Sequence, residues 1–537
     1  MGQILFWLEA SVASILFVAL GLGMYCRIPK RRWLVRFFLE IVWGFLAVLP
    51  WVVVVAGFAA VEFYAGGAQS PLIAASAAGG LFVVAWVVLS RYASKPSSVG
   101  EGSRGSTWRL PRILLAWGAA AVLTGMTFWN LDLAVRQEMA SMRLEAGAMA
   151  LSLSPARIPD SQNAALLYRQ ASEVIDAQDP TKKWQRAVYD WLPGKDKAFD
   201  VDDKQMLDFL RKQGPAIDLL RKAAELPGCN FGIEYKPPSV NMVMPPVRAL
   251  GHLLCLSSRV AAHQGRMSDA MKDLDAAQAL ANHSTADPIV VVGAMFLEDQ
   301  VLETFQYVLA QAPLTGDSAD VRYLNPYLSY RAAVERRMQL ERAFIAYTFT
   351  LSDTSTVLEG QVAEPVEFVI KDAAGLYRVF LWRDDVAEFM KYMQKYEQLA
   401  ALPFHQSVQE LQDEPWFRGR PKGLLNGSVL PSFSSFTRYA AKADASHRIF
   451  ILGIAMERYR LAEGSFPSDL GQLVPKYLPA VPVDPYSGKP LKMVQAKEQV
   501  TIYSVGSDLK DDGGKPIDPK TEGQNPPQGD ITLTLRK

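Results

Sequence analysis

Four long apolar runs dominate residues 1–135 of the chain. Each run is close to the roughly 20 residues that an α-helix needs to cross about 30 Å of hydrocarbon. The runs carry almost no charge apart from Glu9 in the first of them. The pattern predicts a membrane region at residues 1–135, with four transmembrane helices at about residues 4–25, 41–61, 71–90 and 113–131.

The charges between these runs predict an orientation. Lys and Arg fill the loop after the first run and the loop after the third, whereas residues 65–70, after the second, carry no charge. Because basic loops stay on the cytoplasmic side of a membrane, both basic loops are expected inside. The N-terminus and everything after about Asp132 are then expected outside. The basic cluster follows the first run, which is the reverse of a cleaved signal peptide.

Residues 136–440 show apolar positions at helical period instead of long apolar runs. One amphipathic stripe comprises Val386, Phe389, Met390, Met393 and Tyr396. The pattern predicts a mainly α-helical extracytoplasmic domain, with helices over residues 291–311, 328–350 and 382–399 among others.

A helix hairpin is expected at residues 250–264 and 268–281. Five residues match the spacing of the second half of a tetratricopeptide repeat: Gly265, Met267, Ala270, Leu274 and Ala277. Ser257 and Ser258 stand where that repeat has Leu-Gly, and no second copy follows at a period of about 34 residues. The segment resembles a tetratricopeptide hairpin in part, and a generic αα-hairpin is the interpretation we prefer.

No motif in the chain predicts a reaction. The sequence lacks a P-loop, a GxSxG elbow and the HExxH pattern of zinc enzymes. We therefore expect no catalytic residue and no enzyme activity. A net charge of +1 argues against nucleic acid as a partner, because phosphate-binding domains carry a clear basic excess. Cys229 and Cys255 belong to no CxxC pair, and the sequence leaves open a disulfide between them or two buried thiols.

Residues 441–537 read as a separate small α+β module. A helix over about residues 444–462 is followed by Gly464 and Pro467, as helix ends commonly are. A second short helical stretch is expected over residues 470–478. Strand character follows at residues 491–494, 500–505 and 531–535, and the last two strands flank a loop rich in Asp, Gly and Pro.

The segment IAMERYRLAEGSFPSDLGQLVPKYLPAVPVDPYSGKPL, followed by YSVGSDLKDDGG, resembles the C-terminal part of the major pseudopilin of type II secretion. The resemblance covers roughly the last 90 residues. It implies a small antiparallel sheet and a Ca²⁺ site in the acidic loop, since Ca²⁺ takes six to eight oxygen ligands from flexible loops. The positions that match the family's ligands are Asp508, Asp511, Asp512 and Asp530, with Ser504 and Ser507 as carbonyl donors.

The chain as a whole resembles bacterial multi-span membrane proteins that carry a helical extracytoplasmic domain. We therefore expect a protein of the bacterial inner membrane, with its N-terminus and large C-terminal domain on the periplasmic side. Membrane lipid and protein partners of the envelope are the expected contacts. The expected function is a non-catalytic scaffold or partner-binding component. The alternatives are a component of a secretion or transport assembly and an envelope hydrolase with an unrecognised site in the helical domain.

Overall fold

The structure is a computed structural model of the 537-residue chain. It describes residues 109–192, 199–237, 239–241, 246–316, 330–351, 378, 382–413, 433–521 and 526–536. The chain divides into two compact units, which we treat separately. The first comprises residues 1–145, 345–392 and 420–431, and the second comprises residues 146–344, 393–419 and 432–537.

The first three predicted membrane spans lie outside the described residues. The fourth falls in the first half of helix α4 (Arg109–Ser152), and the side chains of residues 109–128 lie outside the described set. Within the described part of the chain, no helix combines the length and the apolar character that a membrane crossing requires.

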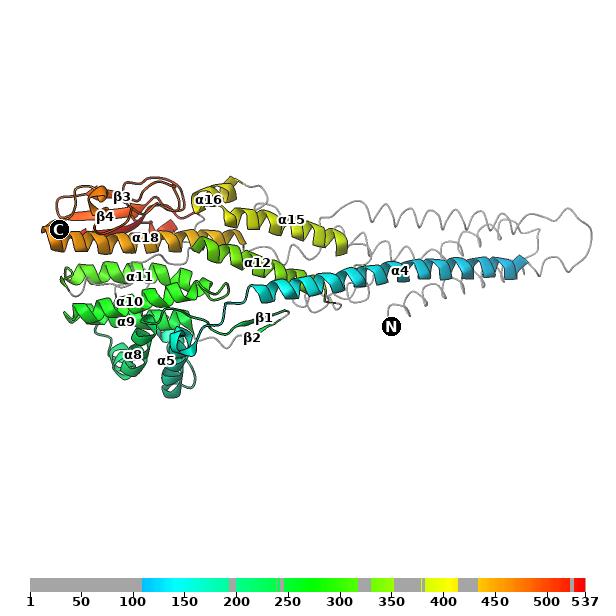
Figure 1. The fold of residues 1–537 in the computed structure, drawn as a ribbon, viewed down its shortest axis with the longest axis horizontal. Coiled ribbons are helices and arrows are strands. Elements are labelled where there is room, and N and C mark those ends of the chain that lie inside the picture. The colour runs from blue at the N-terminus through cyan, green and yellow to red at the C-terminus, as the bar shows by residue number, and fades with distance from the viewer. Residues whose placement is uncertain are drawn as a thin grey trace, which may run out of the picture. The chain divides into compact units, whose positions relative to one another are not determined.

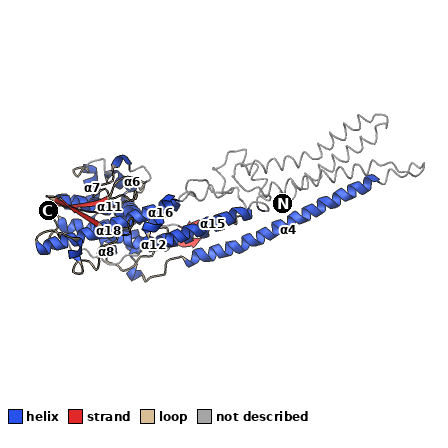
Figure 2. Cartoon of the chain, turned by 90° about the horizontal axis from the view of Figure 1, so that it is seen from above, coloured by secondary structure: helices blue, strands red, loops and turns tan. Residues whose placement is uncertain are grey.

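Helices dominate the described residues, and the strands occupy two small antiparallel sheets (Figure 2). Besides α4, the helices are α5 (Ala164–Gln178), α6 (Trp184–Trp191), α7 (Lys204–Lys212), α8 (Gly214–Ala224), α9 (Val247–His263), α10 (Met267–Ser284), α11 (Val291–Gln311), α12 (Tyr330–Phe349), α15 (Trp382–Ala401), α16 (Phe404–Asp413) and α18 (Phe433–Glu463). The strands are β1 (Glu234–Lys236), β2 (Ser239–Asn241), β3 (Lys492–Gln495), β4 (Gln499–Ser504) and β5 (Ile531–Arg536).

In the second unit, α9, α10 and α11 contact one another, and α18 packs against α11 (Figure 1). The turn between α9 and α10 depends on Gly265, whose φ of +76° lies in the left-handed region. Gly251 lets α9 approach α11, because a Cβ there would lie 2.4 Å from Leu297 Cδ1. The predicted hairpin is therefore confirmed as α9 and α10, and the predicted helix at residues 291–311 coincides with α11.

The three-stranded antiparallel sheet at the C-terminal end has the order β3-β4-β5 and confirms the three predicted strands. It packs against α18 through β4 and β5, and β5 also contacts α11. Gly453 makes this close packing feasible, since a Cβ there would lie 2.4 Å from Leu533 Cδ2 and 2.9 Å from Phe305 Cε1. Gln306 on α11 completes the contact: its Nε2 donates to Thr534 O (2.9 Å), and Thr534 N donates to its Oε1 (2.6 Å).

Two sequence expectations about this segment were wrong in detail. Helix α18 begins at Phe433, about a dozen residues before the amphipathic pattern predicted, because its first turns are held by packing against neighbouring elements such as α16. The expected helical stretch at residues 470–478 is a short 3₁₀ turn, Leu470–Leu473, capped by the Asp469 side chain. Cys229 and Cys255 are both free and buried.

Candidate functional site

Helix α11 contacts two groups of polar side chains, and each group is a candidate functional site. On the α10 and α18 side lies Glu298, which is 1% exposed. On the α9 side lie Phe296, Gln300 and Tyr307, spaced by four and seven residues and therefore close to one line along the helix. We describe the two groups in turn.

The first group is the Glu298 cluster, defined as Gln278, Glu298, Tyr330 and His447. These side chains come from α10, α11, α12 and α18, and none is more than 1% exposed. The carboxylate of Glu298 accepts hydrogen bonds from Gln278 Nε2 and from the Tyr330 hydroxyl, each at 2.8 Å. His447 Nδ1 lies 3.2 Å from Glu298 Oε1 and 2.9 Å from Gln278 Nε2.

This geometry joins four helices through one carboxylate. A buried carboxylate is stable in such a place because several donors replace the water that it has lost. Helices α10, α11 and α12 follow one another in the order of described elements and α18 comes much later, so the cluster ties α18 to the three earlier helices. The pair of Glu298 and His447 has the residue types of an acid–base site, but its full burial means that a substrate would have to open the helix bundle to reach it.

Further polar contacts continue along the boundary between α11 and α18. Asp299 accepts a hydrogen bond from Ser446 Oγ (2.8 Å) and pairs with Lys442 Nζ at 2.5 Å. Asp444 is buried and pairs with Arg448 at 2.8 Å; burial raises the pKa of its carboxyl, and the Arg448 charge opposes that rise. The two Asp299 contacts join α18 to α11, whereas Asp444 and Arg448 pair within α18 itself.

The second group is the α9 stripe, defined as Arg248, His252 and Arg259. Their spacing of four and seven residues places them on one face of α9. Arg248 Cζ lies 4.9 Å from the ring centroid of Tyr189 and 4.7 Å from that of Phe296. Arg259 Cζ lies 5.5 Å from the ring of Phe199 and 5.4 Å from that of Tyr307. Each arginine therefore contacts two aromatic rings, one from α11 and one from the segment of α6 or just beyond it.

The two arginines lack a carboxylate partner within ion-pairing distance among the described residues. Arg221 shows the contrast: Asp273 lies 2.6 Å from its Nε and raises its pKa. Burial lowers the pKa of Arg259 instead, and Thr304 Oγ1, at 3.3 Å, accepts its Nε–H. Arg248 differs from Arg259 in being exposed. The two arginines of the α9 stripe thus lie over aromatic rings rather than pairing with carboxylates.

His252 lies between the arginines and is 5% exposed. Burial, with smaller contributions from the charges of Arg248 and Arg259, lowers its pKa to about 3, so the ring is neutral near pH 7. Its ring meets Tyr189 edge-on with centroids 4.5 Å apart. Within the described residues, His252 Nδ1 and the nearby Gln300 Nε2 on α11 are both buried without a hydrogen-bond partner. Buried polar atoms of this kind call for an explanation, because leaving them unpaired is costly.

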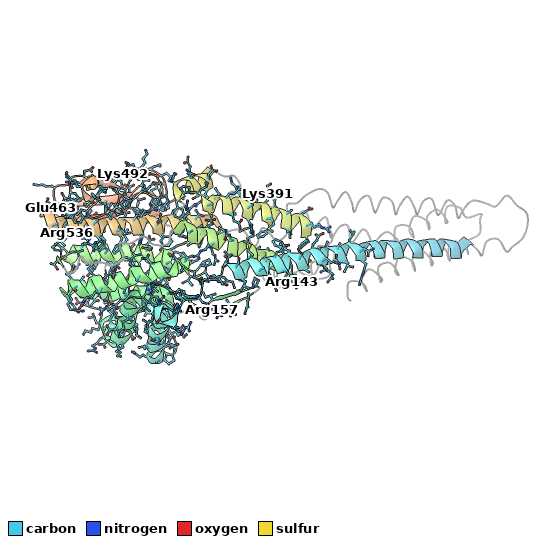
Figure 3. All side chains as sticks on the ribbon, viewed as in Figure 1. Arg143, Arg157, Lys391, Glu463, Lys492 and Arg536 are labelled. Carbon is cyan, nitrogen blue, oxygen red and sulfur yellow. The ribbon has the colours of Figure 1, made fainter. Side chains whose placement is uncertain are left out.

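The six residues predicted to bind Ca²⁺ lie in one loop region beside β3, β4 and β5, and Figure 3 marks Lys492 at its edge. Asp530 is 1% exposed and accepts from Gly514 N (2.7 Å) and Asp512 N (3.4 Å). Asp511 accepts from the Tyr503 hydroxyl (3.1 Å) and pairs with Lys492. Asp508 accepts from Lys510 N (3.2 Å) and Gly529 N (3.4 Å).

The remaining predicted ligands are placed as follows: the Ser504 hydroxyl donates to Asp484 Oδ1 at 2.6 Å, Asp512 offers its backbone N–H to Asp530, and Ser507 follows Gly506 in the turn after β4. Burial raises the pKa of Asp530, with the charges of Asp512 and Asp511 adding to the rise, whereas the Lys492 ammonium lowers that of Asp511. In the part of the chain that is described, no set of three or more His, Cys, Asp or Glu side chains is arranged to hold a metal ion. The Ca²⁺ site stays a prediction.

Asp484 is a residue that the sequence reasoning missed. Its buried carboxylate accepts hydrogen bonds from Ser504 Oγ, Val505 N, Tyr486 N and Ser487 Oγ, at 2.6 to 3.2 Å. It therefore ties the loop before β3 to the end of β4. The signal was present in the DPYSG segment, where Asp followed by Pro typically caps a turn with its own side chain.

The described part of the first unit offers a shallow open groove of about 380 Å³ along α4 and α15, between Trp382, Met142 and Glu145 among others. Its charged residues neutralise one another, since Arg383 donates to both carboxylate oxygens of Glu138 at 2.8 and 2.9 Å. The groove presents no set of converging reactive groups.

Comparison of the chain with protein-family models, with curated proteins and with solved structures finds no match.

Proposed function

We propose that this chain is a non-catalytic, membrane-anchored extracytoplasmic protein that acts as a scaffold or partner-binding component of the bacterial envelope. The observation that carries the proposal is the contrast between the Glu298 cluster and the α9 stripe. The Glu298 cluster joins helices to one another, and the α9 stripe holds two arginines that have no carboxylate within ion-pairing distance among the described residues. A rigid frame with a cationic, aromatic face is suited to binding a partner.

Three further points support this proposal. The apolar runs in residues 1–135 and the basic loops between them favour a membrane anchor with the helical unit outside. The C-terminal segment, in which we propose a pseudopilin-like fold, closes onto α11 and so adds to the frame. Exposed Tyr439 lies 5.3 Å, ring to ring, from Phe296 and extends the aromatic face onto α18.

The first test is the topology of the chain in intact cells. Asp190 is exposed on α6, and Ser98 lies in the basic loop between the third and fourth apolar runs. A membrane-impermeant maleimide is expected to label an Asp190→Cys variant in intact cells, and a Ser98→Cys variant after permeabilisation only. Native Cys229 and Cys255 are buried, so they contribute little background, and Cys26 is replaced by Ser in both variants. The reverse labelling would overturn the proposed orientation.

The second test asks whether the chain has partners at all. A photo-reactive amino acid in place of exposed Tyr439 is expected to give specific cross-linked products in growing cells. The same substitution at exposed Leu461, near the end of α18, provides the matched control. Equal product patterns at the two positions would remove the support for a specific binding face.

A further inference from the structure

We propose that the face formed by Arg248, Tyr189, Phe296 and Tyr439 binds an acidic segment of a protein partner, with Arg248 receiving a carboxylate and the rings receiving an adjacent aromatic side chain. This inference rests on the proposed partner-binding function and names the chemistry of the partner. The four residues come from α6, α9, α11 and α18 of the second unit.

The surroundings of the Arg248 guanidinium indicate that it binds a carboxylate. Its guanidinium lies over two rings, 4.9 and 4.7 Å from their centroids. Stacking uses the flat faces of the group and leaves its in-plane N–H bonds for a planar acceptor, which a carboxylate matches with two parallel hydrogen bonds. Among the described residues, Arg248 donates no side-chain hydrogen bond and forms no ion pair. Because it is exposed, an incoming anion reaches it without opening the fold.

The rings of Phe296 and Tyr439 indicate that the partner has an aromatic side chain next to that carboxylate. Phe296 and Tyr439 lie with their centroids 5.3 Å apart at 49°, and Tyr439 is 49% exposed. Tyr and Arg are enriched where binding energy concentrates in protein interfaces, because they bury a large area at low entropic cost. The rings are half-buried and held by separate elements, so they are positioned before a ligand arrives.

His252 provides an independent observation at the same place. It is buried beneath the Tyr189 ring, one helical turn from Arg248, and its Nδ1 has no partner among the described residues. A neutral imidazole there adds no positive charge, so Arg248 alone supplies the charge at this end of the stripe. The unpaired atom is buried, so the partner expected for it is a water molecule held beneath the Arg248 face.

The observations favour a peptide over a lipid surface. A membrane surface attracts clusters of flexible Lys and Arg side chains, each contributing by charge alone. Here one arginine lies over rings from two helices, α6 and α11, which is a geometry that selects shape as well as charge. A second copy of this chain is a further occupant that the experiment must distinguish.

The experiment uses the full-length chain in nanodiscs of phosphatidylcholine. The probe is a fluorescein-labelled peptide in which Glu adjoins Phe in a Gly-Ser background, and its control has Gln in place of Glu. Fluorescence anisotropy is expected to show binding of the Glu peptide, with the Gln peptide weaker by about tenfold or more, the worth of a charged hydrogen bond.

Variants locate the binding. Arg248→Ala is expected to weaken the Glu peptide by about tenfold or more, and Arg248→Lys by nearly as much, since an ammonium lacks the planar fork. Arg266→Ala is the matched control, because Arg266 is exposed just beyond α9 but paired with Asp269 at 2.8 Å. Its affinity for the peptide is expected to equal that of the unmodified chain. Equal affinities for Arg248→Ala and Arg266→Ala would overturn the proposal.

Two other outcomes would also overturn it. Vesicles of phosphatidylglycerol that bind in an Arg248-dependent manner, without any peptide binding, would assign the face to lipid. An Arg248-dependent dimer in sedimentation would assign it to a second copy of the chain. If the Glu peptide does not bind but photo-cross-linking at Tyr439 still gives specific products, the proposed partner-binding function stands. The proposal that the partner is an acidic, aromatic segment is then wrong.

Discussion

The Glu298 cluster and the α9 stripe differ in what surrounds their charged groups. Glu298 on α11 is enclosed by side chains from three other helices, at 2.8 to 3.3 Å, whereas Arg248 and Arg259 on α9 lie over aromatic rings with no carboxylate within ion-pairing distance among the described residues. Burying a charge is costly unless it is paired and hydrogen-bonded. The difference indicates that the Glu298 cluster stabilises the fold. The exposed end of the α9 stripe, at Arg248, is the part suited to binding a partner.

The largest expected effect comes from removing the central acceptor of the cluster. Glu298→Ala leaves Tyr330 and Gln278 without their buried acceptor and is expected to lower the free energy of unfolding by about 3 kcal/mol or more. Thermal melting followed by helical circular dichroism measures it. The control on the same helix is Gln300→Ala, whose amide nitrogen has no partner among the described residues, so its loss is expected to be small. Equal losses would contradict the division between the two groups.

The next effect concerns the glycines that set how closely helices approach α11. Gly453→Ala places a Cβ 2.4 Å from Leu533 Cδ2 and is expected to cost about 1–3 kcal/mol of unfolding free energy. Gly147→Ala, in helix α4, has nothing within 4 Å of the new Cβ and is expected to stabilise by about 0.5–1 kcal/mol. Melting temperatures of the two variants test the prediction, and a neutral Gly453→Ala would show that this packing relaxes easily.

Acid is expected to weaken the fold through the buried histidine of the α9 stripe. The pKa of His252 is about 3 in the folded chain, against 6.5 for an unperturbed histidine. Between these values the unfolded chain binds a proton that the folded chain does not, so stability falls as pH drops from about 6.5 toward 3. The slope reaches about 1.4 kcal/mol per pH unit. His252→Gln is expected to flatten the dependence of melting temperature on pH in this window; an unchanged slope would refute the assignment.

Calcium tests the acidic loop separately from both polar groups. If the loop binds Ca²⁺, a concentration of about ten times Kd is expected to stabilise the chain by about 1.4 kcal/mol, and a chelator is expected to reverse the gain. Asp512→Asn is expected to abolish the response, while the stability in chelator stays close to that of the unmodified chain. If the melting temperature does not change with Ca²⁺, the loop is held by the hydrogen bonds of Asp530 and Asp508 and not by a metal ion.

The smallest expected change in stability comes from the residue with the largest expected effect on binding. Arg248→Ala removes two exposed cation–π contacts and is expected to lower the free energy of unfolding by about 0.5–1 kcal/mol. The peptide affinity falls about tenfold in the same variant. Comparison of its melting temperature with its anisotropy titration separates the two effects. A large loss of stability would instead place Arg248 among the structural residues.

Local patterns were sufficient for several elements of the second unit. The apolar period located α11, and the glycine at position 265 located the turn between α9 and α10, because each signal lies within the element that it predicts. The alternation and the flanking turns located β4 and β5 in the same way. The start of α18 was missed because its first turns depend on packing rather than on an amphipathic pattern.

The Glu298 cluster and the aromatic partners of the α9 stripe could not be predicted from the sequence. Gln278 and His447 are 169 residues apart along the chain, and nothing near either residue encodes their contact. Helical spacing alone places Arg248 and His252 on one face of a helix, yet the rings beside Arg248 come from α6 and α11 and are brought together by tertiary structure. A side chain's partner, unlike its element, is set by the arrangement of whole helices.

The pairing of Gln306 with Thr534 has a consequence for biosynthesis. These two residues are 228 positions apart, yet they exchange two hydrogen bonds, and Arg536 also donates to Ala310 O on α11. The contact between α11 and β5 can therefore form only after β5 has been synthesised. Until then, the side of α11 that β5 covers is exposed. Non-local closure of this kind is slow and leaves nascent chains open to aggregation. We therefore expect chains that end before β5 to aggregate more readily than the full-length chain.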